Sequence, residues 1–268
     1  MTQVVRELRL TPHALSLRGA LSVVERHVLS YRKSWVYIVS GFFEPFFYLL
    51  GIGIGLGRLV GSLTVSGHPV SYAVFVAPGL LASSAMNGAV FDATYNFFYR
   101  LKVEKTYAAM LATPLRVIDI ATGELGWTLI RGMIYATGFL LVMAGFGYCD
   151  SYWAIACLPG AALISLAFGS IGLAVTSFMK SWQDIGSVSL AMLPMFLFSG
   201  TFYGLGVYPG WFQVVVKCSP LYQGVSLLRA FDIGAIDPFL FVHVAYLVSV
   251  TLVGMWVVSA RLRRVLTP

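Results

Sequence analysis

The sequence predicts an all-α polytopic membrane protein with six transmembrane helices. Composition is the first observation behind this prediction: 58% of the 268 residues are hydrophobic and only 11% are charged, whereas soluble domains have roughly 45–50% and about 25%. Mean hydropathy is +0.82. A chain with so few charges cannot cover a surface that faces water. These values exclude a soluble enzyme, a disordered chain and, despite a net charge of +7, a nucleic-acid-binding protein.

Long apolar segments are the second observation, because a helix needs roughly 20 apolar residues to cross a bilayer. One transmembrane domain is expected over residues 1–268, with a cytoplasmic segment at 1–33. The predicted spans cover residues of about 35–57, 70–91, 117–147, 151–179, 184–204 and 238–260. Proline and glycine residues recur after Tyr203 and interrupt the apolar segment there. We therefore expect the outer segment before the sixth span to re-enter the membrane or to lie flat at its surface.

The first 33 residues carry many charges and predict an amphipathic helix. Thr11-Pro12 is typical of a helix start, and apolar residues then recur at helical spacing: Leu17, Leu21, Val24 and Val28. Such a helix lies on the membrane surface or against a partner. The alternative is a short helix with no docking role. No apolar core precedes these charges, so a cleaved signal is not expected.

The distribution of lysine and arginine predicts the orientation of the chain. Fourteen of the 18 basic residues lie on one side of the predicted spans: Arg6, Arg9, Arg18, Arg26, Arg32, Lys33, Arg100, Lys102, Lys105, Arg116, Lys180, Arg261, Arg263 and Arg264. Only Arg58, Lys217 and Arg229 lie on the other side, and Arg131 lies within a span. Both termini are therefore expected in the cytoplasm.

Two connections are long enough to have roles of their own. Residues 95–113 form the longest cytoplasmic connection and are compatible with a short helix. This helix would either receive a partner protein or simply cover lipid headgroups. Residues 205–237 on the outer side are rich in aromatic residues. They predict either an interfacial aromatic belt or a lid over an exit for an amphiphilic substrate.

Three charged residues fall within predicted spans: Glu44, Glu124 and Arg131. A charge at the centre of a span costs a few kcal/mol, so it marks a functional or a buried structural contact. Glu124 and Arg131 lie two helical turns apart on one face, too far for an i,i+4 pair, and each is expected to have its own partner. They would act either as a proton relay or as structural contacts between helices, and we favour the structural role.

Motifs for chemistry are not found in the sequence. The glycines at positions 51, 53, 55 and 57 do not follow the G-x-G-x-x-G pattern of nucleotide loops; we interpret them as small residues that let helices approach closely. No Walker A motif, catalytic set or metal site is visible, and three cysteines without a C-x-x-C pair predict no disulfide framework.

Three stretches resemble a known family: FVAPGLLASSAMNGAVFDATY (75–95), KTYAAMLATPLRVIDIATGELGW (105–127) and LPMFLFSGTFYGLGVYPGWFQVVVKCSPLYQGVSLLR (193–229). They are similar to permease subunits of type-2 ABC transporters, in the branch of nodulation-factor (lipooligosaccharide) and daunorubicin-type drug exporter permeases. One departure follows the PLY motif. The branch often continues as H-x-V-E, whereas this chain has Gln223 and Ser226.

The resemblance implies a role for each part of the chain. Two permease chains would pair, each docked to a separate ATPase subunit that binds ATP and magnesium, so this chain would bind no cofactor itself. The helix at about residues 15–29 would be the connecting helix. The coupling helix between spans 2 and 3 would include Phe98, Arg100, Lys102, Glu104, Lys105, Tyr107, Met110 and Leu111. The substrate pathway would include Phe42, Phe43, Phe46, Asn87, Phe196 and Phe198.

The leading functional hypothesis is the permease of an ATP-driven exporter in the plasma membrane, carrying a lipid-linked saccharide, a lipid or a hydrophobic drug. Such a chain is a transport subunit and not an enzyme. The alternative is a proton-coupled secondary transporter that uses Glu124 and Arg131. An intramembrane enzyme or an assembly scaffold is a third possibility, although no cluster of catalytic polar residues supports it.

Overall fold

The structure is a computed structural model that describes residues 17–31, 43–65, 68–149 and 151–266. Helices occupy most of it. The α-helices are α2 (Leu17–Tyr31), α4 (Phe43–Leu50), α5 (Gly57–Val60), α6 (Tyr72–Phe91), α7 (Thr106–Met110), α8 (Val117–Gly145), α9 (Cys157–Phe178), α10 (Asp184–Leu197), α11 (Gly210–Lys217), α12 (Pro220–Ile233) and α13 (Leu240–Leu266). The π-helical segments are η1 (Gly51–Leu56), η2 (Asp92–Asn96) and η3 (Tyr99–Val103), and the 3-10 segments are η4 (Tyr152–Ala156) and η5 (Leu205–Val207).

Four helical runs in the described residues are long and apolar enough to cross a membrane: Tyr72–Val103, Val117–Gly145, Tyr152–Phe178 and Leu240–Leu266. This finding agrees with the prediction of a helical membrane protein. The other two predicted spans correspond to α10, which has 14 residues, and to the run from α4 through η1 to α5. Both are shorter in the described part of the chain than a complete span, and part of the first predicted span lies outside the described residues.

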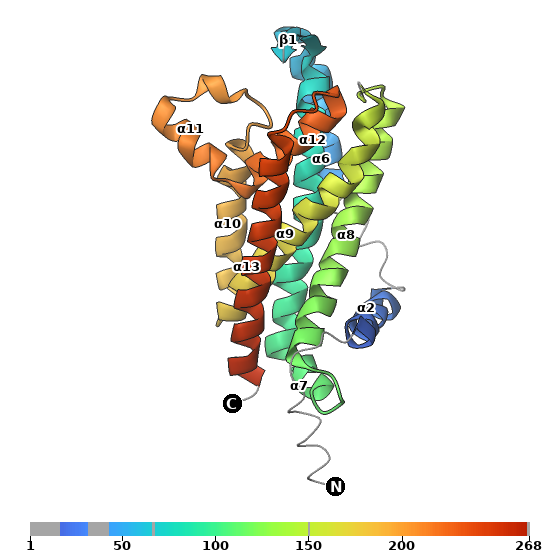
Figure 1. Cartoon of the computed structure of the whole chain (residues 1–268), viewed down its shortest axis with the longest axis vertical. Helices are drawn as coiled ribbons and strands as arrows, with labels where there is room; N and C mark the ends of the chain where they lie inside the picture. Colours follow the sequence, from blue (N-terminus) through green and yellow to red (C-terminus); the bar gives the residue numbers. More distant parts are fainter. Residues whose placement is uncertain (1–16, 32–42, 66–67, 150, 267–268) are drawn as a thin grey trace.

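The long helices form an elongated bundle (Figure 1). α9 lies within the bundle and packs against α6, α8, α12 and α13. α7 and the carboxyl end of α13 lie at one end of the bundle, and α2 crosses α8 near that end. The strand β1 (Ser62–Val65) and α11 lie at the opposite end. We call the first the α7 end and the second the outer end.

Small residues allow these helices to approach one another closely. A Cβ atom added to Gly123 would lie 2.6 Å from Val23 Cβ, and one added to Gly254 would lie 2.5 Å from Ser170 Oγ. By contrast, a Cβ added to Gly51, Gly55 or Gly57 would meet nothing within 4 Å. Among the described residues, these three glycines therefore make no close helix contact. The close contacts there come from glycines of α6, α8, α9, α12 and α13.

The segment after α6 differs from the expected loop at residues 95–113. The chain remains helical to Val103 through two π-helical segments, η2 and η3. It breaks at Lys105, whose φ of 52° places it in the left-handed region. The five-residue helix α7 follows directly. The expected coupling helix over residues 98–111 is thus divided into the end of a long helix and a separate short one.

The outer end contains a short β-hairpin that the all-α prediction did not include. β1 pairs antiparallel with β2 (His68–Ser71), and Leu63 lies opposite Val70. Ser71 then begins α6 as its N-cap, since its side chain accepts a hydrogen bond from the Val74 amide. The hairpin therefore leads directly into the first long helix.

The segment between α10 and α13 folds back at the outer end. α10 ends at Leu197, and the chain continues through η5 and α11 into α12. α12 packs against α6, α9 and α13, and its Leu221, Val225, Leu227 and Leu228 are buried. α11 is largely exposed. This arrangement is compatible with the predicted re-entrant segment.

Candidate functional site

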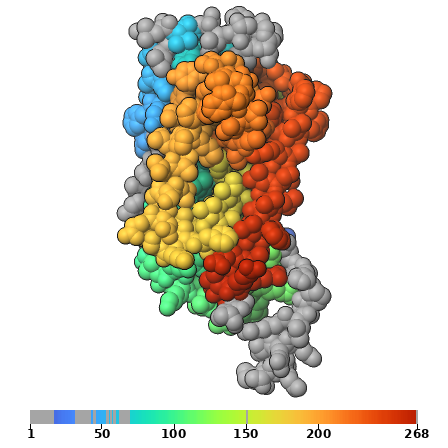
Figure 2. Space-filling view, turned by 90° about the vertical axis from the view of Figure 1, so that its left-hand side faces the viewer, coloured from blue at the N-terminus to red at the C-terminus, as the bar shows by residue number. Residues whose placement is uncertain are grey.

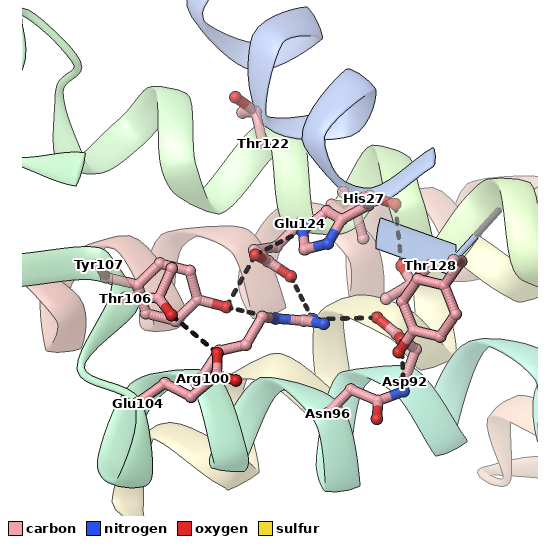
Figure 3. Close-up of polar contacts among 12 residues, drawn as sticks. His27, Asp92, Asn96, Arg100, Glu104, Thr106, Tyr107, Thr122, Glu124 and Thr128 are labelled. Atoms are coloured by element: carbon pink, nitrogen blue, oxygen red, sulfur yellow. Dashed lines mark hydrogen bonds and ion pairs between the residues drawn. The ribbon is translucent and has the colours of Figure 1, made fainter. Parts of the chain in front are cut away.

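A network of buried polar side chains lies near the α7 end of the bundle (Figure 3). It joins α2, the π-helical end of α6, α7 and α8. Its main members are His27, Asp92, Arg100, Tyr107, Glu124 and Arg131, all of which are buried. Charged groups are rarely this buried unless they are paired, so the contacts of each member decide what the network does.

Glu124 on α8 is the centre of this network. Its Oε2 accepts a hydrogen bond from Arg100 Nη2 at 2.7 Å. Its Oε1 accepts one from the Tyr107 hydroxyl at 2.7 Å and contacts His27 Nε2 at 2.9 Å. These three partners come from η3, α7 and α2. One fully buried carboxylate therefore holds three elements to α8.

Asp92 is the second carboxylate and lies between the two arginines. Its Oδ2 accepts from Arg100 Nη2 at 3.2 Å, and its Oδ1 accepts from Arg131 Nη1 at 3.1 Å. Asn96, one turn further along, donates to Oδ1 at 2.7 Å. Two carboxylates and two guanidinium groups thus balance in charge. This pairing offsets the desolvation penalty that each ion would otherwise have in the interior.

Two tyrosine hydroxyls complete the network as hydrogen-bond donors. Burial, together with the neighbouring Glu124 carboxylate, raises the pKa of Tyr107 well above its usual value. Burial, with a further contribution from Asp92, raises the pKa of Tyr31 to about 12. Both hydroxyls therefore keep their protons at physiological pH. Tyr107 donates to Glu124, and Tyr31 donates to Asp92 at 3.3 Å.

α2 is attached to α8 by packing as well as by charge. Gly19, Val23 and His27 recur every four residues and form its buried face. The rings of His27 and Tyr31 stack on Trp127 of α8 at centroid distances of 5.4 Å and 5.2 Å. A separate apolar face is exposed: Leu17, Leu21 and Val28. α2 is therefore an amphipathic helix that docks on its own chain and leaves an apolar face free to contact lipid.

The structure separates the eight residues predicted for the coupling helix into two layers. Phe98, Arg100, Tyr107 and Met110 are buried. Lys102, Glu104 and Lys105 are exposed, and Leu111 is half-buried. The exposed side of α7 and the turn after it present small residues: Ala108, Ala109 and Ala112. Arg100 and Tyr107 of the buried layer belong to the network, whereas Phe98 and Met110 pack in apolar clusters. The exposed layer is the part that is accessible to another protein.

The described residues among those predicted for a substrate pathway lie on α4, on α6, and on α10 with its C-cap. Phe43, Phe46 and Phe47 contact one another on α4. Phe196 on α10 packs against Tyr48 at a centroid distance of 5.8 Å. Phe198 packs instead against Phe212 of α11 at 5.2 Å. Asn87 is half-buried on α6.

Two further predicted residues cannot be placed in full. Phe42 lies outside the described residues, and so does the side chain of Glu44, although its backbone belongs to α4.

The sequence analysis missed Asp92 and His27, and it did not pair Arg100 with Glu124. One signal was present: Asp92, Asn96 and Arg100 recur every four residues and form a polar stripe on one face of an apolar helix. No comparable signal marks His27, which is 97 positions from its partner Glu124. The expectation that Glu124 and Arg131 have separate partners agrees with the structure, since Arg131 contacts Asp92. Within the described residues, no group of three or more His, Cys, Asp or Glu could hold a metal ion.

Comparison with known proteins places this geometry in context. Residues 19–233 match the family described as ABC-2 type transporter. The chain is 32% identical over 250 residues to nodulation protein J of Rhizobium meliloti (strain 1021), covering 92% of this chain and 94% of the relative. It is 34% identical over 246 residues to nodulation protein J of Rhizobium leguminosarum bv. viciae, covering 91% and 93%. It is 27% identical over 185 residues to the inner membrane transport permease YadH of Escherichia coli (strain K12), covering 68% and 71%.

Proposed function

The chain belongs to the ABC-2 type transporter family and is a membrane subunit of an ABC transporter; on this premise we propose that it is the permease of an ATP-driven exporter. ATP and magnesium would bind to a separate ATPase subunit, and two permease chains would pair around the pathway. The substrate would be an amphiphile: a lipid-linked saccharide, a lipid or a hydrophobic drug. Similarity to nodulation protein J supports this class of substrate, and so does the resemblance of residues 75–95, 105–127 and 193–229 to lipooligosaccharide and drug exporter permeases.

One observation carries the proposal for the mechanism: Glu124 contacts α2, η3 and α7 at once. The exposed face of α7, with Ala109 and its neighbours, would receive the movement of the ATPase. Tyr107 on the opposite face is hydrogen-bonded to Glu124, so a displacement of α7 would pull on α8. Arg100 belongs to the run that begins as α6, so the same displacement would also move the first long helix.

Two π-helical segments precede α7 and support a mechanical role for this region. π-helical turns are rare and often occur at functional sites, because an extra residue in a turn strains the helix. η2 and η3 carry Asp92 and Arg100 respectively. Two members of the charged network thus lie on π-helical turns that continue α6, where a change of helical register would move both of them.

The charge balance argues against the alternative of a proton-coupled transporter. Both buried carboxylates contact a guanidinium group, Glu124 through Arg100 and Asp92 through Arg100 and Arg131. A guanidinium group within hydrogen-bond distance stabilises the charge of a carboxylate, which suits a structural ion pair better than a proton relay. These charges are better suited to holding helices together.

The proposed location is the plasma (cell inner) membrane with both termini in the cytoplasm. The name of the YadH relative, an inner membrane transport permease, supports a location in this membrane. The orientation is supported by the basic residues, because α7 and the carboxyl end of α13, with Arg263 and Arg264, lie at the same end of the bundle. Cytoplasmic loops carry an excess of lysine and arginine.

Affinity purification from the native membrane tests this function. The tagged chain is solubilised in mild detergent, and every co-purifying protein is identified and quantified. We expect a P-loop ATPase in stoichiometric amount. A tagged, unrelated polytopic protein from the same membrane is the control. A chain that purifies without any ATPase in several detergents would contradict the exporter proposal and favour the proton-coupled alternative.

A further inference from the structure

The segment that connects α10 to α12 is hydrogen-bonded to the bundle at its two ends. We call residues 202–216, which include η5 and all of α11 except Lys217, the outer cap. Immediately before it, Arg229 of α12 donates from Nη2 to the carbonyl oxygens of Gly200 at 2.8 Å and Thr201 at 3.4 Å. Immediately after it, Gln223 of α12 donates from Nε2 to the Lys217 carbonyl oxygen at 2.5 Å.

The first end is held by a charged group. Besides its bonds to the chain after α10, the Arg229 guanidinium lies 3.9 Å from the centroid of the Phe75 ring and donates to the Phe75 carbonyl at 3.2 Å. Tyr72 adds a hydrogen bond from its hydroxyl to the Phe202 carbonyl at 3.2 Å. Charge-assisted hydrogen bonds are roughly twice as strong as neutral ones. This end of the outer cap is therefore firmly fixed to α6 and α12.

The second end is held by neutral groups from two helices. The Gln223 amide nitrogen donates to Lys217, so its Oε1 is the acceptor that contacts His243 Nδ1 on α13. With this orientation of the amide, His243 Nδ1 carries the hydrogen and donates a hydrogen bond to Gln223 Oε1. Tyr246, on the next turn of α13, donates from its hydroxyl to the Cys218 carbonyl at 2.5 Å. Gln223 directly follows the PLY motif on α12, and α13 supplies His243 opposite it.

Between its two ends, the outer cap is mostly exposed. Trp211 is 72% exposed, and Val214 is 62% exposed. Its side-chain hydrogen bond from Gln213 Nε2 to the Tyr208 carbonyl, 2.8 Å long, lies within the cap itself. Figure 2 shows this segment at the outer end of the molecule, near α13. Release of the second end would therefore loosen α11, which would then be held by its buried Val216 and by the packing of Phe212 against Phe198, while the first end acts as a pivot.

We propose that Gln223 and His243 are positioning residues that hold the outer cap closed, and that release of this pair opens the outer end for the passage of substrate. The opening step rests on the proposed exporter function, whereas the holding of the cap does not. Neither residue needs to touch substrate. Their effect is to set the equilibrium between an attached and a detached α11.

Hydrogen–deuterium exchange on the intact permease–ATPase complex, in nanodiscs of phosphatidylethanolamine and phosphatidylglycerol, tests the holding of the cap. His243→Leu removes the donor, whereas His243→Asn keeps an N–H close to the position of Nδ1. Loss of one such hydrogen bond predicts about three- to tenfold faster exchange in residues 210–219 for His243→Leu, with restoration in His243→Asn. Gln213→Ala removes a glutamine within the cap and should leave the exchange of residues 217–219 unchanged.

A second comparison separates gating from a merely structural role. If the pair is released during transport, vanadate trapping of the ATPase should speed the exchange of α11 in the native complex. In His243→Leu the pair is already absent, so the exchange of α11 should be the same in the nucleotide-free and the trapped state. The proposal would be overturned if His243→Leu speeds the exchange of α11, relative to the native chain, equally in the nucleotide-free and the trapped state. It would also be overturned if His243→Leu does not speed this exchange at all. If no ATPase co-purifies, the exporter function fails; the comparison of His243→Leu with His243→Asn in the permease alone still decides whether the pair holds the cap.

Discussion

At the scale of single residues, the two buried carboxylates are not equivalent. Glu124 shares Arg100 with Asp92, so Arg100 retains a carboxylate partner if either one is lost. Arg131 makes its ion pair with Asp92 and lies midway along the 29-residue α8. Asp92 thus balances a charge deep in the bundle, whereas Glu124 mainly joins elements. The two residues should respond differently to neutralisation.

We expect Asp92→Asn to destabilise the protein more than Glu124→Gln. The first change leaves Arg131 buried without its carboxylate partner, which costs about 3–5 kcal/mol. The second leaves Arg100 paired with Asp92 and keeps an oxygen that can accept from Tyr107, so a loss of about 1–3 kcal/mol is expected. Thermal unfolding in detergent, followed by fluorescence-detected size-exclusion chromatography, measures the difference.

The exposed carboxylate Glu25 on α2 provides the control for this comparison. Glu25→Gln removes the same charge from the surface and should leave the unfolding temperature unchanged. A Glu124→Gln protein that unfolds at a lower temperature than Asp92→Asn would show that the assignment of the deeper charge is wrong.

At the scale of the elements, α7 has two faces with different surroundings. Its Tyr107 is only 1% exposed and belongs to the charged network, whereas Ala108 and Ala109 face outward. A five-residue helix is too short to be stable alone. α7 therefore keeps its shape because Tyr107 and Met110 are buried against the bundle. In the proposed mechanism it would transmit force only while this contact holds.

Substitutions on the two faces of α7 should separate binding of the ATPase from folding. We expect Ala109→Arg to reduce co-purification of the ATPase at least tenfold, because a large charged side chain prevents close contact, with no change in unfolding temperature. Tyr107→Asp should lower the unfolding temperature, because it places a second carboxylate beside Glu124 in the interior. Both variants are tested by quantitative pull-down and thermal unfolding.

Ala109→Ser is the matched control, since it keeps the exposed face of α7 small and should bind the ATPase normally. If Ala109→Arg binds the ATPase as well as the native chain does, the exposed face of α7 is not the docking surface, and the proposed path of coupling would have to change.

At the scale of the whole molecule, charge and hydrogen bonds are distributed unevenly between the two ends. The α7 end has the charged network and most of the exposed basic residues. The outer end has the hairpin, the outer cap, the Arg229 guanidinium that donates to backbone carbonyls, and neutral hydrogen bonds such as those of Gln223 and Tyr246. This division suits a protein in which force enters at one end and an exit opens at the other.

Thiol labelling in intact cells tests which end faces the cytoplasm. In a chain whose three native cysteines are replaced by serine, single cysteines are placed at Lys105 on the α7 end and at Ile236 on the outer end, where both side chains are exposed. A membrane-impermeant maleimide should label the cysteine at 236 and leave the one at 105 unlabelled until the cells are lysed. The reverse pattern would overturn the orientation predicted from the basic residues.

The class of protein and its long helices could be predicted from local patterns. The predicted span at 117–147 agrees closely with α8 (Val117–Gly145), and the predicted surface helix over residues 15–29 overlaps α2. Hydrophobic length and helical spacing act over a few turns, so they can be read along the chain. The family resemblance extended these patterns to a function, and the comparison with nodulation protein J confirms the family.

The partners of the buried charges were decided only by the tertiary structure. The sequence showed that Glu124 and Arg131 are costly in a membrane, but not that His27, Arg100 and Tyr107 meet at Glu124. Those residues come from three elements whose positions depend on the packing of α2 and η3 against α8. The inward orientation of the Tyr107 side chain and the pairing of Gln223 with His243 also depend on how the helices pack together. Local hydrophobicity determines which segments are helical, whereas the pairing of polar groups depends on which helices pack together.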